Sequence, residues 1–177
     1  MKVSMVDLKK FVRDVPDYPK PGILFRDITP LLADANALEA ATDALVGLFE
    51  GENIDVIAAA EARGFIFAAP LALRLGVGFV PIRKPGKLPY DSHTYSYDLE
   101  YGSDELHLHV DAVEKGQRVL LVDDLLATGG TMEACCRLLE KTGAEVVGCA
   151  FLIHLLDLGG ERRLEPHRCR SVLNYGG

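Results

Sequence analysis

Short apolar runs alternate with amphipathic stretches along most of the chain. Four runs are nearly all apolar, as expected for parallel strands covered on both faces: residues 54–60, 77–82, 118–122 and 146–153. Three stretches have helical periodicity and end near a glycine: residues 35–49, 64–75 and 130–142. This strand–helix alternation predicts an α/β fold, a parallel sheet flanked by helices, with ligands bound beyond the carboxyl ends of the strands.

Two regions depart from this alternation. Near the N-terminus, Met5, Leu8 and Phe11 share a face and predict a helix, which a proline-rich bend and an extended piece at residues 23–28 follow. Residues 83–96 are polar and rich in Lys, Pro and Gly, so we expect a long flexible loop of the kind that forms lids. The alternating segments TYSYDLEY and ELHLHV follow that loop and predict an antiparallel hairpin.

Length and charge narrow the class of protein. The chain has 177 residues and no repeat or linker, which predicts a single domain over residues 1–177. Its 19 basic and 26 acidic residues give a formal charge of −7, which argues against binding nucleic acid or a membrane surface through bulk charge. Because no apolar stretch is long enough for a signal peptide or a membrane span, a cytoplasmic location is expected.

The cysteines and histidines predict packing more than chemistry. None of the four cysteines has CxxC spacing, and we expect them to pack as reduced thiols: Cys135, Cys136, Cys149 and Cys169. His107 and His109 fall on one strand face, which we interpret as a solvated face in preference to a metal site. No metal ligand from the protein is predicted.

The most informative stretch is VLLVDDLLATGGT, residues 119–131, in which a buried strand turns into a helix. Gly129 and Gly130 have no side chains, so a ligand can approach their backbone N–H groups closely. Thr128 and Thr131 add hydroxyl donors, and the N-terminus of the following helix favours an anion. Together these groups predict a cradle for a phosphate monoester.

Two carboxylates, Asp123 and Asp124, precede this cradle. They can accept hydrogen bonds from vicinal sugar hydroxyls or from waters on a magnesium ion, and phosphate beside a diol is the layout of a ribose phosphate. The alternative is an ordinary glycine-rich turn with nearby acids. The stretch contains neither GxxxxGK[ST] nor GxGxxG, so the nucleoside-triphosphatase and dinucleotide-binding interpretations fail.

The stretch resembles the phosphoribosyl pyrophosphate (PRPP) loop of type I phosphoribosyltransferases. Four more segments match the adenine-specific members of that family in order: PKPGILFRDITPLL, IDVIAAAEARGFIFAAPLA, PIRKPGKLP and YSYDLEYG. The resemblance covers nearly the whole chain and implies a Rossmann-like sheet with a small N-terminal hood. It further implies a homodimer that acts in purine salvage, joining adenine to PRPP to give AMP and pyrophosphate, with Mg²⁺ held by the substrate.

The same resemblance implies a set of site residues. It assigns binding of the ribose phosphate to Asp123, Asp124, Ala127, Thr128, Gly129, Gly130 and Thr131. Pyrophosphate falls on Glu61, Ala62, Arg63, Arg83, Lys84 and Lys87, and the family's peptide bond at 61–62 is typically cis. Adenine falls on backbone groups of Leu24, Phe25 and Arg26, with its ring between Phe25 and Leu125. The alternatives are a solvated basic loop and a phenylalanine in a core strand.

Ala127 raises the question of which residue is the acid. Enzymes of this type that act on 6-oxopurines have an aspartate there, facing purine N7, and alanine cannot hold a proton. The resemblance assigns the role to Glu100 of LEYG, with a pKa raised by burial when the loop closes. An exposed hairpin carboxylate is the alternative.

Two other functions are also compatible with this sequence. One is a related transferase for another base. The other is a regulator that binds PRPP without catalysis, which would bring a DNA-binding segment and a basic face that 177 residues and a charge of −7 do not accommodate.

Overall fold

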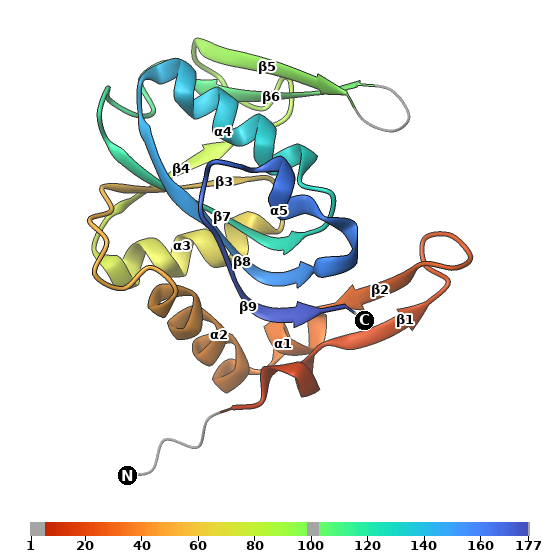
Figure 1. Cartoon of the computed structure of the whole chain (residues 1–177). Helices are drawn as coiled ribbons and strands as arrows, with labels where there is room; N and C mark the ends of the chain where they lie inside the picture. The colour runs from red at the N-terminus through yellow and green to blue at the C-terminus, as the bar shows by residue number, and fades with distance from the viewer. Residues whose placement is uncertain (1–5, 99–102, 177) are drawn as a thin grey trace. The chain divides into compact units, whose positions relative to one another are not determined.

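The computed structural model describes residues 6–98 and 103–176, which divide into two compact units. The boundary falls inside helix α2, because the first unit ends at Ala44 and the second begins at Leu45. The elements of the first unit, up to and including the helix it shares, are η1 (Leu8–Phe11), β1 (Arg13–Pro16), β2 (Leu24–Asp27), α1 (Thr29–Ala33) and α2 (Ala35–Gly47) (Figure 1). The prediction of a single domain stays a prediction.

The first unit corrects the expected N-terminal helix. Of the described part of that stretch, which begins at residue 6, only Leu8–Phe11 is helical, as a short 3₁₀ turn. The chain then enters β1, which pairs antiparallel with β2, so the extended piece at residues 23–28 is a strand as predicted. The turn between them is closed partly by the Tyr18 ring, which packs edge-on against Phe25 at 5.2 Å between centroids.

The second unit contains the predicted parallel sheet. Its strand order is β4-β3-β7-β8-β9, and every neighbouring pair is parallel. Its strands are β3 (Val56–Ala60), β4 (Gly78–Ile82), β7 (Arg118–Leu126), β8 (Glu145–Leu155) and β9 (Cys169–Tyr175). The expected α/β fold is therefore confirmed, although β9 was not predicted.

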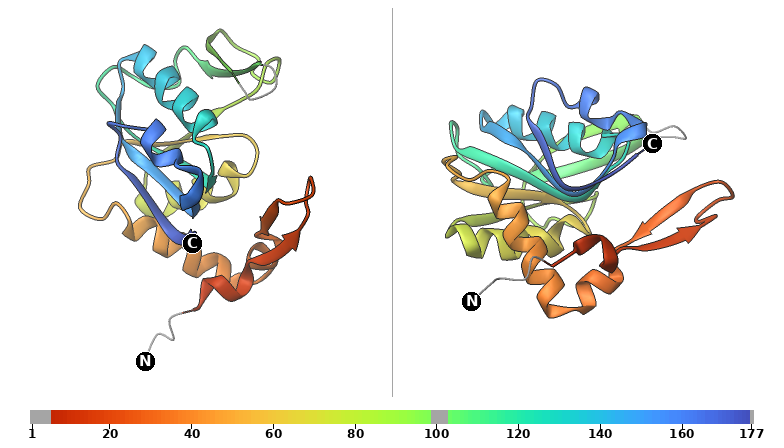
Figure 2. Two further views of the ribbon diagram at one scale, coloured as in Figure 1. Left: turned by 45° about the vertical axis from the view of Figure 1, so that its right-hand side comes forward. Right: turned by 60° about the horizontal axis from the view of Figure 1, so that its bottom comes forward.

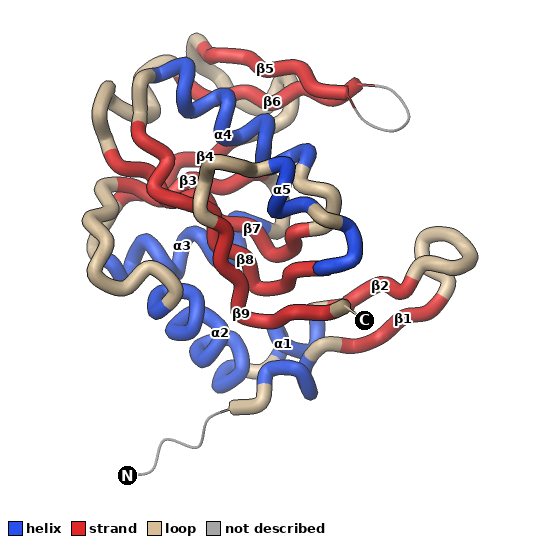
Figure 3. The backbone as a smooth tube through the Cα atoms, in the orientation of Figure 1, coloured by secondary structure: helices blue, strands red, loops and turns tan. Residues whose placement is uncertain are grey.

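Helices cover this sheet on both faces. Figures 1 and 2 show α3 (Gly64–Leu75) and α4 (Gly130–Thr142) on opposite sides of it. Both helices have the predicted bounds, because each ends at a glycine in the left-handed region, Gly76 at φ 69° and Gly143 at φ 80°. Short turns, η2 (Leu156–Leu158) and α5 (Gly160–Arg163), follow β8 (Figure 3).

The predicted hairpin is present as a separate two-stranded sheet. It consists of β5 (Ser92–Asp98) and β6 (Ser103–His109), and β5 packs along α4 (Figure 1). Because β5 begins at Ser92, the irregular loop is shorter than the expected residues 83–96. His107 and His109 are both partly buried, not solvated as expected. The backbones of Arg83 and His107 form an antiparallel bridge, and His107 Nε2 lies 2.5 Å from Glu105 Oε1.

The cysteines pack as predicted. Cys135, Cys136 and Cys149 are buried and Cys169 is half-buried, all as free thiols.

No group of three or more His, Cys, Asp or Glu side chains within residues 6–98 and 103–176 is arranged to hold a metal ion. Among the described helices, none combines the length and the apolar character that crossing a membrane requires.

Candidate functional site

Strand β7 carries both predicted acids to the carboxyl edge of the sheet. The strand continues four residues beyond its predicted end. Asp123 therefore pairs with β8, and Asp124 lies between two residues that do. A turn follows, in which Gly129 adopts a φ of 83°, and helix α4 begins at Gly130. The strand–turn–helix path that the sequence predicted is therefore present.

A hollow of about 200 Å³ lies where β7 leads into α4. It is lined by Arg63 and residues 123–132, which include every residue assigned to the ribose phosphate, together with Leu125. The first backbone N–H groups of a helix have no intrahelical partner, so the N-terminus of α4 offers donors here. Two carboxylates, two threonines, a glycine pair and an arginine thus share one cavity wall.

The two acids have different surroundings. Asp124 is buried, and its Oδ2 lies 2.6 Å from Nε of Arg63. Asp123 accepts a hydrogen bond on Oδ1 from the Asp124 backbone N–H at 2.9 Å. Burial, and secondly the charge of Asp124, raise the pKa of Asp123 well above its ordinary value. The site therefore favours a proton on Asp123 while Asp124 pairs with a guanidinium.

This arrangement predicts opposite stability effects for two matched variants. The folded state binds the Asp123 proton more tightly than the unfolded chain, so this contribution is lost as pH rises through the raised pKa. Asp123→Asn keeps the acceptor without the charge, and we expect a midpoint of thermal unfolding a few degrees higher at about pH 8 and little changed below about pH 4. Asp124→Asn, which breaks the Arg63 pair, should instead lower the midpoint at about pH 8. A midpoint lowered by Asp123→Asn at that pH would contradict this account.

The residues assigned to pyrophosphate meet at the ends of β3 and β4. The Glu61–Ala62 peptide bond is cis, and Ala62 is exposed. Glu61 accepts hydrogen bonds from the Lys84 backbone N–H at 2.6 Å and from Arg83 Nη2 at 3.3 Å. The Lys84 hydrogen bond is the main cause of a lowered Glu61 pKa. Glu61 therefore joins the two loops as an ionised acceptor.

The expected cations differ in how they are held. Arg63 pairs with Asp124, and the ammonium of Lys84 pairs with Asp104 on β6. Arg83 lies beside Glu61, but its Nε is buried and has no hydrogen-bond partner within the described part of the chain. Lys87 is exposed. Three of the four cations are thus held by carboxylates beside the strand ends.

The residues assigned to adenine belong to both units. Leu24, Phe25 and Arg26 lie on β2 of the first unit, where Arg26 pairs with Asp14, whereas Leu125 lines the hollow of the second unit. Glu100 lies outside the described residues. Adenine contacts and the acid role of Glu100 therefore stay predictions.

Sequence reasoning missed the segment that supports the phosphate loop. A Cβ atom added to Gly160 of α5 would lie 2.2 Å from the Ala127 carbonyl oxygen, and one added to Gly129 would lie 2.7 Å from the Gly160 carbonyl oxygen. The two backbones are therefore in direct contact. The stretch LGGERR carries no recognisable motif, so only this long-range contact identifies it.

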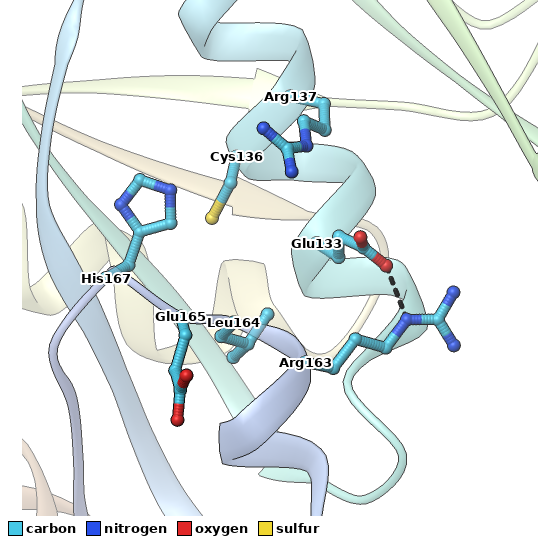
Figure 4. A pocket seen from close by; sticks show the side chains of 7 residues that line it. All are labelled: Glu133, Cys136, Arg137, Arg163, Leu164, Glu165 and His167. Carbon is cyan, nitrogen blue, oxygen red and sulfur yellow. Dashed lines mark hydrogen bonds and ion pairs between the residues drawn. The ribbon is translucent and has the colours of Figure 1, made fainter.

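Side chains extend this support onto α4. Figure 4 shows Arg163 reaching Glu133, with which it forms an ion pair, and its guanidinium lies against Gly130. The hollow drawn there, beside Cys136 and His167, has a volume of about 10 Å³, room for about one water molecule. The contacts of Arg163 in this region pack α5 against α4.

Comparison with known proteins agrees with this site. The family described as phosphoribosyl transferase domain matches residues 28–174. An adenine phosphoribosyltransferase of Rhodopirellula baltica is 68% identical over 172 residues, covering 97% of this chain and 84% of the relative. The crystal structure of adenine phosphoribosyltransferase from Thermoanaerobacter pseudethanolicus has a TM-score of 0.94 at 50% identity, covering 97% of this chain and 100% of that one.

A third comparison includes bound ligands. The adenine phosphoribosyltransferase of Saccharomyces cerevisiae, solved with adenine and an imino-altritol bisphosphate, has a TM-score of 0.86 at 37% identity and covers 94% of this chain and 95% of its own. The fold and the resemblance expected from the sequence are confirmed. This chain belongs to the phosphoribosyl transferase family, among its adenine phosphoribosyltransferases.

Proposed function

We propose that this protein transfers the phosphoribosyl group of PRPP to adenine, forming AMP and pyrophosphate, as a step of purine salvage. The observation that carries the proposal is the hollow where two acids and a Thr-Gly-Gly-Thr turn meet at the start of α4. The relatives named adenine phosphoribosyltransferase, and the yeast structure that holds adenine, support the choice of base.

The hollow would receive the ribose phosphate. In this proposal the phosphate ester lies against Ala127, Thr128, Gly129, Gly130 and Thr131, where N–H and hydroxyl donors and the helix dipole offset its charge. Asp123 and Asp124 accept hydrogen bonds from the ribose hydroxyls. Asp123 would have to lose its proton to accept hydrogen bonds on both carboxylate oxygens, which the positive charge of Arg63 favours.

Magnesium would be held mainly by the donor. The acids beside the hollow, Asp123 and Asp124, fit waters of a Mg²⁺–PRPP complex, while the described residues form no three-ligand metal site. When bound, the ion would neutralise charge on the pyrophosphate. The protein's own contribution would be the oxygen acceptors that orient the hydrated complex.

The cationic loops would stabilise the leaving group. As the bond between C1′ and pyrophosphate breaks, negative charge grows on pyrophosphate, and preorganised cations lower the energy of that transition state. Arg63, Arg83, Lys84 and Lys87 are the residues we assign to this role. The Nε of Arg83, which has no partner among the described residues, supports the assignment, since a buried donor without a partner gains most from an arriving anion.

The base would be activated at N7. In the proposed step, N9 of adenine bonds to C1′ while pyrophosphate leaves with the electron pair of the broken C1′–O bond, so the purine carries positive charge until it loses one proton. Glu100 would hydrogen-bond at N7 and take the proton that the purine loses there, acting as the N7 acid in the reverse reaction, since Ala127 cannot. Leu24, Phe25 and Arg26 would read the base edge, with the ring between Phe25 and Leu125.

The resemblance also supports a cytoplasmic homodimer without a nucleic-acid or membrane partner. The net charge of −7 agrees with the absence of such polyanionic partners. Size-exclusion chromatography with light scattering tests the dimer.

A panel of bases tests the proposed reaction. The protein, PRPP and Mg²⁺ are incubated separately with adenine, hypoxanthine, guanine, xanthine, uracil and orotate, and nucleotide products are separated by chromatography. We expect AMP from adenine and at least 100-fold slower turnover of the other bases, an order of discrimination that hydrogen-bonded recognition provides, about 10²-fold or more. Turnover confined to another base would favour the related transferase, and PRPP binding without any transfer would favour the regulator.

A further inference from the structure

A chain of polar contacts joins the two loops that the proposed function places at opposite ends of PRPP. The ammonium of Lys84 pairs with the Asp104 carboxylate. The Tyr97 hydroxyl lies 3.2 Å from Asp104 Oδ2 and 3.4 Å from Oγ1 of Thr131. Thr131 lines the phosphate hollow, whereas Asp104 does not. Tyr97 and Asp104 had no role in the sequence predictions.

Tyr97 and Asp104, in the middle of this series of contacts, are held in place by their surroundings. Tyr97 is only 8% exposed and belongs to the apolar core between the hairpin and α4. It lies directly opposite Asp104 across the β5–β6 ladder, and Asp104 Oδ1 also accepts the Glu105 backbone N–H at 2.9 Å. The hairpin is anchored to α4 by Lys141, whose ammonium donates to the Thr94 carbonyl at 2.8 Å. Neither Tyr97 nor Asp104 can follow a moving partner freely.

The other side of the hairpin is fixed to the end of β4. Arg83 N–H donates to the His107 carbonyl at 2.9 Å, and His107 N–H donates to the Arg83 carbonyl at 2.7 Å. The neighbouring backbone N–H of Lys84 is bound by Glu61. The hairpin therefore has fixed positions relative to both loops.

The direction of each hydrogen bond follows from the groups involved. The Lys84 hydrogen bond lowers the pKa of Asp104, so this carboxylate is ionised and can only accept. Burial raises the pKa of Tyr97, so its single proton is retained and points to Asp104. The Thr131 hydroxyl then donates to the Tyr97 oxygen. This hydrogen bond holds Thr131 in one rotamer at the wall of the hollow.

We propose that Tyr97 and Asp104 are positioning residues that couple the phosphate loop to the pyrophosphate loop, holding Thr131 and Lys84 in place for one PRPP molecule. This inference rests on the proposed function. Loss of Asp104 would release Lys84 directly and Thr131 through Tyr97, whereas loss of the Tyr97 hydroxyl would release Thr131 alone.

AMP is the probe that separates the two ends, because it carries the 5′-phosphate and no pyrophosphate. Calorimetry would measure the Kd of AMP for the wild type, Tyr97→Phe, Asp104→Ala and the double variant. We expect each single variant to raise the Kd about fivefold, the order of one lost hydrogen bond. The double variant should raise it no more than Asp104→Ala alone, since both changes act on Thr131 through the same contact.

Two further variants serve as controls. Tyr95→Phe removes a hydroxyl from the same strand, where the ring packs under Lys141, and should leave the Kd of AMP within about twofold of wild type. Lys84→Met should weaken binding of PRPP more than binding of AMP, because Lys84 is placed at the pyrophosphate end. Asp104→Ser replaces Asp104→Ala if thermal unfolding shows that the alanine variant does not fold.

The outcomes separate this inference from the proposed function. A wild-type chain that binds neither PRPP nor AMP would overturn both. Normal binding by the wild type, together with unchanged AMP binding by Asp104→Ala, would overturn the coupling alone. Effects of Tyr97→Phe and Asp104→Ala that multiply in the double variant would likewise show that the two residues act independently.

Discussion

Gly160→Ala is expected to weaken PRPP binding by about 100-fold. The added Cβ would lie 2.2 Å from the Ala127 carbonyl oxygen, so either the phosphate loop or α5 must shift. A shift of about 1 Å in a positioned site can cost about 10²-fold in activity, and crowding of this kind destabilises a protein by about 1–3 kcal/mol. Calorimetric titration with PRPP and Mg²⁺ measures the first effect, and urea unfolding measures the second.

Gly47→Ala is the matched control for this prediction. Gly47 ends α2, and a Cβ there would have no atom within 4 Å. Alanine also favours helix over glycine, so this variant should bind PRPP normally and unfold at the same or a slightly higher urea concentration. Wild-type PRPP affinity in folded Gly160→Ala would show that α5 does not position the phosphate loop.

Glu100→Ala is expected to lower the turnover of adenine by about 10²–10⁴-fold, the range that a positioned acid contributes. Ala127 lines the hollow where the 6-oxopurine enzymes would have their aspartate, so no acid is available from that position. The effect should fall on kcat, with PRPP binding nearly unchanged, because the positive charge that Glu100 offsets at N7 develops only as N9 bonds to C1′. Steady-state kinetics with AMP detection measures it.

Two comparisons sharpen the Glu100 prediction. Glu100→Gln keeps a hydrogen-bonding group at N7 but can neither take nor return a proton, so its turnover should lie between those of wild type and Glu100→Ala. Glu105→Gln changes a hairpin carboxylate that contacts His107 and Ser96, and it should retain most activity. Full turnover by Glu100→Ala would place the acid elsewhere.

The parts of the fold that the sequence predicted are those whose signals are local. Helix α3 ends where Gly76 permits a left-handed residue, and strand β3 is apolar throughout because both of its faces are covered. Strand β9 was missed because it lies at the sheet edge and mixes buried Leu173 with exposed Asn174, so no clear period is present. Strand β1 was missed because the nearby prolines argue against a strand, and because this short, exposed strand depends on its pairing with β2.

The site divides in the same way. The turn at Gly129 was predictable because glycines, threonines and acids stand together in sequence, and they also meet in one hollow. The support from Gly160 and the contact between Tyr97 and Thr131 join segments far apart in the chain, so no local pattern reports them. The ion pair between Arg63 and Asp124 likewise appears only when β3 and β7 lie side by side.

A crystal structure of the protein with AMP tests the central claim most directly. The account predicts phosphate oxygens within hydrogen-bond distance, about 2.7–3.2 Å, of backbone N–H groups of residues 128–131. It also predicts the ribose hydroxyls beside Asp123 and Asp124. AMP bound with its phosphate away from this turn, or bound elsewhere than at the carboxyl edge of the sheet, would contradict it.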